Sequence, residues 1–160
     1  MRYKVAPPAR SLAVLADARA AIPLVPEPEA DCCRAIQQAT DCGTRDEART
    51  LLTFLQALDL VAESERGYYR TQRSLDREQA GAAFRQQVFL VAELLGALED
   101  GPLDVEGTFA AVRDEIPPWE RNRHADWTAV WRERVANLLE WGVIFDLLTA
   151  DGEGYALAAQ

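Results

Sequence analysis

The stretch from Thr44 to Thr71, TRDEARTLLTFLQALDLVAESERGYYRT, decides the fold of the chain around it. Its first part carries alanine and leucine three and four residues apart, the spacing that places apolar side chains on one stripe of a helix. A polar turn over residues 63–67 then separates the apolar residues 60–61 from two tyrosines at 68–69. That pattern is typical of a β-hairpin. The stretch therefore predicts a helix that runs directly into a short hairpin.

A similar unit closes the sequence. A helical pattern that ends at residue 142 runs into a second hairpin pattern, with apolar residues at 143–148, a turn at 150–152 and Gly-Tyr at 154–155. We expect Gly142 to take the left-handed conformation that ends this helix, as Asp59 does in the first copy. The helix ends align at an offset of 83 residues and the Gly-Tyr pairs at 87, so the second hairpin is expected to be four residues longer.

Further helices precede each of these units. Ser11 is a suitable N-cap for the first helix, and prolines from Pro23 onward end it. Thr44 with Glu47 three residues later predicts a capping box at the start of the third helix. The run from Phe84 to Leu98 predicts one strongly apolar, buried helix where the two halves join. The remaining helices are expected over residues 29–39, 104–116 and 127–141, with a loop over 119–126.

The order of helix, helix, turn, helix and hairpin resembles a winged helix-turn-helix domain. The resemblance implies a mainly α fold with short β-hairpins, built from two tandem winged-helix modules. Its boundaries place the first module at residues 1–72, a polar connector at 73–83 and the second module at 84–160.

The charge of the chain is unusual. The formal net charge is -9, and Lys4 is the only lysine among 17 basic residues. An acidic, alanine-rich and lysine-poor chain resembles the proteins of extreme halophiles such as haloarchaea, where carboxylates keep the surface hydrated in salt. No apolar run approaches the roughly 20 residues of a membrane span, and residues 1–10 lack a secretory signal. We therefore expect a cytoplasmic protein.

The charge is also unevenly distributed. Residues 1–85 hold 12 acidic and 12 basic residues, whereas residues 86–160 hold 14 acidic and five basic residues. DNA is therefore expected to bind the first module. The outward face of the last helix carries Glu133 and Glu140, so the second module is expected to mediate dimerisation or bind a protein partner.

In winged helices the third helix commonly enters the major groove, and the wing contacts the DNA backbone. Opposite the leucine stripe, four polar residues follow one another at i, i+4, i+8 and i+11, and two arginines lie on the wing. The candidate DNA contacts are Arg45, Arg49, Thr53 and Gln56 on the helix, and Arg66 and Arg70 on the wing. The alternative is a solvated face, because Asp46 and Glu47 lie among the arginines.

The loop after Pro117-Pro118 contains the candidate partner interface, which comprises Trp119, Arg121 and Arg123. We expect a homodimer that presents two first modules to DNA, because specific sites are usually read by symmetric dimers. The competing expectation is a compact monomer.

The sequence does not indicate an enzyme. It lacks a nucleophile elbow and a glycine-rich phosphate loop, and the three cysteines with His124 do not have zinc-site spacing. We expect no catalytic residues, no cofactor and no metal. The predicted function is a DNA-binding transcriptional regulator. The alternative is a non-catalytic interaction scaffold, like the winged-helix subunits of chromosome-organising or transcription complexes.

Overall fold

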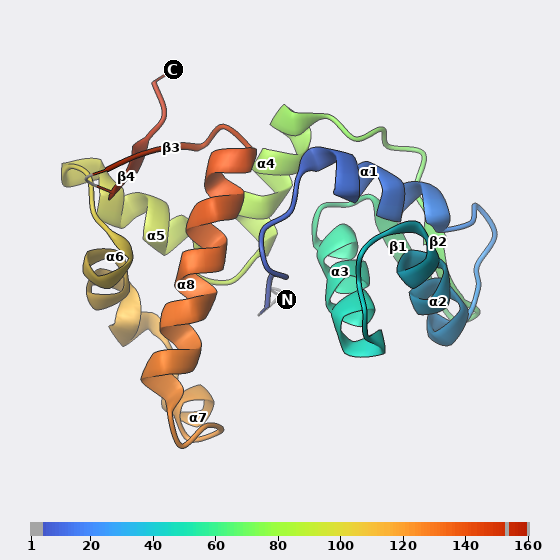
Figure 1. The fold of residues 1–160 in the computed structure, drawn as a ribbon, viewed down its shortest axis with the longest axis horizontal. Coiled ribbons are helices and arrows are strands. Elements are labelled where there is room, and N and C mark those ends of the chain that lie inside the picture. The colour runs from blue at the N-terminus through green and yellow to red at the C-terminus, as the bar shows by residue number, and fades with distance from the viewer. Residues whose placement is uncertain (1–4, 153, 160) are drawn as a thin grey trace. The chain divides into compact units, whose positions relative to one another are not determined.

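A group of helices followed by a β-hairpin occurs twice along the chain in the computed structural model, which describes residues 5–152 and 154–159 (Figure 1). One compact unit extends to Val88 and the other begins at Phe89. Helices predominate, and the strands form two separate two-stranded antiparallel sheets. The predicted fold class, mainly α with two tandem winged-helix modules, is confirmed.

The first unit contains three helices that pack on one another, then the wing and a fourth helix. Its elements are α1 (Leu12–Ala21), α2 (Glu29–Ala39), α3 (Arg45–Ala57), β1 (Val61–Ser64), β2 (Gly67–Arg70) and α4 (Arg77–Gln87). The core is formed by the leucine stripe of α3 together with Ile36 of α2, Leu15 of α1 and Ile22 at the C-cap of α1, all fully buried. Phe54 of α3 meets Phe84 of α4 edge to face, with ring centroids 6.1 Å apart.

The second unit repeats this order with an insertion before its last helix. Its elements are α5 (Val91–Ala97), η1 (Leu98–Asp100), α6 (Val105–Val112), η2 (Arg113–Glu115), α7 (Pro118–Arg121), α8 (Trp127–Ile144), β3 (Leu148–Asp151) and β4 (Gly154–Leu157). Trp131, Leu139 and Trp141 of α8 are buried in its core. Among the described residues, no helix has both the length and the apolar character that a membrane crossing requires.

Each wing is extended by one more backbone segment. In the first unit Tyr68 pairs with Glu27 through hydrogen bonds of 2.8 and 3.0 Å, and in the second Tyr155 pairs with Leu103 through bonds of the same lengths. The segment before the second helix of each unit is thereby held against the wing. This repeated bridge fixes where helix and wing meet within each unit.

The prediction of one continuous helix over residues 84–98 is wrong. α4 ends at Gln87, and α5 begins only at Val91, after Leu90 has taken the left-handed conformation with φ 78°. Val88 and Leu90 are both fully buried. An unbroken helix would place residues two apart on nearly opposite sides, so the break allows both side chains to be buried.

The expected role of Gly142 is also wrong. It lies inside α8, which continues to Ile144, and the left-handed residue after the helix is Asp146 with φ 59°. A Cβ on Gly142 would lie 2.7 Å from Cδ1 of Leu148. The glycine therefore gives space for the first strand of the wing to pack on the helix, and it does not form the turn.

With this correction, each residue from the third helix to the end of the wing in the first unit corresponds to the residue 87 positions later in the second unit. Asp59 and Asp146 have φ 64° and 59°, and both hairpins pair four residues with four. The second hairpin is not longer, contrary to expectation. Glu27 and Leu103 are offset by 76 residues, so the 11 additional residues lie between the second and third helices, where η2 and α7 occur.

Candidate nucleic-acid interface

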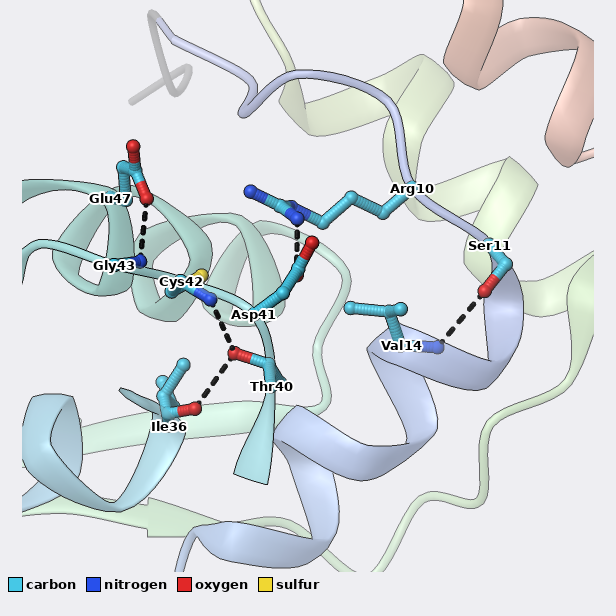
Figure 2. A network of polar contacts seen from close by, with 9 residues as sticks. All are labelled: Arg10, Ser11, Val14, Ile36, Thr40, Asp41, Cys42, Gly43 and Glu47. Carbon is cyan, nitrogen blue, oxygen red and sulfur yellow. Dashed lines mark hydrogen bonds and ion pairs between the residues drawn. The ribbon is translucent and has the colours of Figure 1, made fainter. Parts of the chain in front are cut away.

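The turn that connects α2 to α3 is fixed by side-chain hydrogen bonds (Figure 2). The Thr40 hydroxyl donates to the Ile36 carbonyl at 2.7 Å and accepts from the Cys42 amide at 3.2 Å. The Glu47 carboxylate accepts from the Gly43 amide at 2.9 Å, one residue before the position that a capping box predicts. These bonds satisfy amides of the turn, and the Thr44 hydroxyl accepts from the Glu47 amide at 3.1 Å, which caps the start of α3.

The four candidate residues of α3 lie together outside its buried stripe. Arg45 and Arg49 are exposed, and Thr53 and Gln56 are partly exposed. At about 100° per residue, these positions fall within one sector of the helix. We call the four residues the outer face of α3. On the wing, Arg66 is exposed at the hairpin turn, whereas Arg70 ends β2 and is partly buried.

Arg49 is already paired with carboxylates. Its Nε donates to Oε1 of Glu29 on α2 at 2.7 Å, and one of its terminal nitrogens lies 3.8 Å from Asp46. Both pairs are at the surface, so each contributes little stability. The positive charge of this guanidinium is therefore partly neutralised by neighbouring carboxylates.

Carboxylates also pair with other arginines of the first unit. Figure 2 shows one of these pairs, between the N-terminal segment and the turn before α3. The pairs are Arg10 with Asp41, Arg34 with Asp31 at 3.8 Å and Arg73 with Asp59 at 3.7 Å. The equal numbers of acidic and basic residues in this half are thus partly arranged as direct ion pairs.

The buried thiol of Cys33 on α2 lies near Arg45 and Arg49 of the outer face of α3. Burial raises the pKa of Cys33, Glu29 adds to the rise, and Arg45 and Arg49 oppose it. Burial raises the pKa of the neighbouring Cys32 to about 11. These thiols are therefore protonated at neutral pH. Within the part of the chain that the structure describes, no three metal-ligating side chains gather in one place.

The equivalent face of the second unit has different chemistry. At the offset of 87 residues, the counterparts of the outer face of α3 are Arg132, Ala136, Glu140 and Val143. Arg132 pairs with Glu106 at 2.5 Å, and Glu140 accepts a hydrogen bond from the Tyr155 hydroxyl of the wing. Of the two arginines on the outer face of α3, only Arg45 has a basic counterpart in the second unit, which is Arg132. The sequence alignment at offset 83 missed this correspondence, and the matching Asp-Leu pairs at 59–60 and 146–147 were the signal for it.

The expected loop over residues 119–126 is partly helical, because α7 extends to Arg121, and the three candidate interface residues differ in their surroundings. Trp119 is 54% exposed. Arg121 donates to the carbonyls of Ile116 and Arg113 at 3.1 and 2.9 Å, so its guanidinium links α7 to the backbone of the preceding segment. Arg123 is mostly exposed and lies 3.5 Å from the buried carboxylate of Glu120.

Two successive units of three helices and a wing define the chain as a tandem winged-helix protein. The sequence profile of the halobacterial double winged helix domain family matches residues 1–160, and the chain belongs to this family. This finding confirms the resemblance to haloarchaeal proteins. No curated protein and no solved structure matches the chain.

Proposed function

We propose that this protein is a DNA-binding regulator of transcription that holds DNA through its first unit. The observation that carries the proposal is the difference between two units of the same architecture. The first presents Arg45, Arg49, Thr53 and Gln56 on its third helix, whereas the second presents Arg132, Ala136, Glu140 and Val143. Phosphate is attracted to arginine and repelled by carboxylate, so the first unit is the better match for a polyanion.

In this proposal the outer face of α3 enters the major groove. Arginine side chains can donate two hydrogen bonds either to guanine or to a backbone phosphate, and glutamine can form two hydrogen bonds with adenine. Arg66 and Arg70 of the wing contact phosphates, which fixes the register of the domain without reading sequence. Thr53, between the two ends of the face, is suited to either a base edge or a phosphate.

The second unit is proposed to bind protein. A single winged helix contacts few base pairs, and symmetric dimers commonly read two half-sites one helical turn apart. Of the three candidate interface residues, Trp119 and Arg123 are exposed, whereas Arg121 is taken up by internal hydrogen bonds. We propose a homodimer formed through the second unit. Light scattering tests this directly, because a monomer mass of 17.8 kDa at micromolar concentration would exclude it.

One observation favours a different function. Arg49 is paired with Glu29 and Asp46, which lowers the positive potential where DNA would approach. A winged-helix scaffold that binds only proteins would tolerate such pairing. The two functions are separated by measuring whether the purified protein binds duplex DNA at all.

The deciding experiment is fluorescence anisotropy with a labelled duplex at several salt concentrations. The double variant Arg45→Ala, Arg49→Ala should lose at least tenfold in affinity, with a salt slope that is smaller by about 0.9 for each lost phosphate contact. Arg132→Ala is the matched control, because it removes the arginine at the equivalent position of the second unit. Equal affinity for wild type and the double variant would exclude the outer face of α3 as the DNA contact, and no binding by wild type would favour the scaffold.

A further inference from the structure

The ion pair between Arg49 and Glu29 joins two helices of the first unit. Glu29 is the first residue of α2, and its Oε1 accepts a hydrogen bond from Nε of Arg49 in α3 at 2.7 Å. The Arg49 side chain is 50% exposed and that of Glu29 is 36% exposed. The guanidinium is therefore accessible from solvent while one of its donors is already used by a carboxylate.

The second unit lacks both members of this pair. The counterpart of Glu29 at the offset of the second helix is Val105, and the counterpart of Arg49 at the offset of the third helix is Ala136. The remaining arginine of that face, Arg132, pairs with Glu106, whose counterpart in the first unit is Ala30. Each unit thus has one ion pair between the start of its second helix and its third helix, but the two pairs occupy positions that do not correspond.

We propose that Glu29 competes with DNA phosphate for Arg49 and so limits the affinity of the first unit for DNA. This inference rests on the proposed function. Carboxylate and phosphate are both recognised by the planar donors of arginine, so the two acceptors compete for the same nitrogens. DNA must separate the pair before it gains the contact. Asp46, 3.8 Å away, is the more distant carboxylate and contributes less.

The test compares two substitutions that each remove one negative charge from the first turn of α2. Glu29→Gln removes the competing carboxylate, whereas Asp31→Asn removes a carboxylate that faces Arg34 at 3.8 Å. Glu29→Gln should tighten binding to a labelled duplex by about fivefold, which equals about 1 kcal/mol at 1.36 kcal/mol per tenfold change. Asp31→Asn should tighten it by less than about twofold, through long-range repulsion alone.

The same pair of substitutions in an Arg49→Ala background completes the test. In that background Glu29→Gln should increase the affinity for the duplex no more than Asp31→Asn does, because the guanidinium for which Glu29 competes is absent. Equal gains from the two substitutions in the parent protein, or a gain from Glu29→Gln that persists without Arg49, would overturn the competition. Binding by wild type without any effect of Glu29→Gln refutes this inference alone. A failure of both wild type and Glu29→Gln to bind DNA refutes the proposed function as well.

Discussion

Replacing Gly67 by alanine should break the wing of the first unit. Gly67 has φ 131°, a conformation that residues with a Cβ rarely adopt, and it opens β2. A Cβ at this position would lie 2.0 Å from the carbonyl oxygen and 2.4 Å from the carbonyl carbon of Glu27. Both are backbone atoms, so the clash cannot be relieved by turning a side chain. The segment before α2 must move away from Tyr68.

The cost has two parts. Moving the segment breaks two hydrogen bonds between Glu27 and Tyr68, of 2.8 and 3.0 Å, each worth about 1 kcal/mol. The left-handed backbone adds strain of about 1–3 kcal/mol for a residue other than glycine. Alanine also lowers the conformational entropy of the unfolded chain, which offsets about 0.4–1 kcal/mol of this loss in stability. The net loss is about 2–4 kcal/mol, a large fraction of the stability of one small domain.

The two units can be followed separately during urea unfolding. All four tryptophans lie between residues 119 and 141, so tryptophan fluorescence follows the second unit and far-ultraviolet circular dichroism follows both. Gly67→Ala should lower the circular dichroism midpoint at constant salt. Gly43→Ala is the control, because a Cβ there meets no atom within 4 Å. A Gly67→Ala protein within about 0.5 kcal/mol of the control would refute the reasoning, since such a difference is typical of unstrained surface positions.

Two further predictions concern the second unit and alkaline pH. Arg121→Ala should lower the free energy of unfolding of the second unit, followed by tryptophan fluorescence, by about 2–4 kcal/mol. The substitution removes two charge-assisted hydrogen bonds and a guanidinium 4.8 Å above the ring of Trp127. Arg123→Ala, which removes only a surface ion pair, should cost under about 1 kcal/mol. Equal effects would contradict the internal role of Arg121. Burial raises the pKa of Cys32 to about 11 and those of Tyr68 and Tyr155 to about 12. The folded state therefore holds these protons more tightly than the unfolded chain, and stability that is present below pH 9 should be lost as the pH rises toward 12. A urea midpoint that does not change over this range would contradict the prediction.

The sequence by itself determined the local elements and their repetition. The leucine stripe of α3, the cap at Thr44 and the polar turn before Tyr68 each depend on residues close together in the chain. Periodicity and capping act over a few residues, so they can be read without tertiary information. The mainly α fold with two wings followed from them, as did the polar face that carries Arg45 and Arg49.

Tertiary structure decided what those residues meet. Gly142 has the appearance of a helix-ending glycine, and only the approach of Leu148 reveals that it is required for packing. In the same way, nothing in the local pattern places Glu29 against Arg49, because they are 20 residues apart and belong to different helices. The spacing of side chains along one helix follows from backbone geometry, whereas the partner of a side chain depends on how helices cross. The site was therefore predictable as a set of positions, and its electrostatic state was set by the packing of α2 on α3.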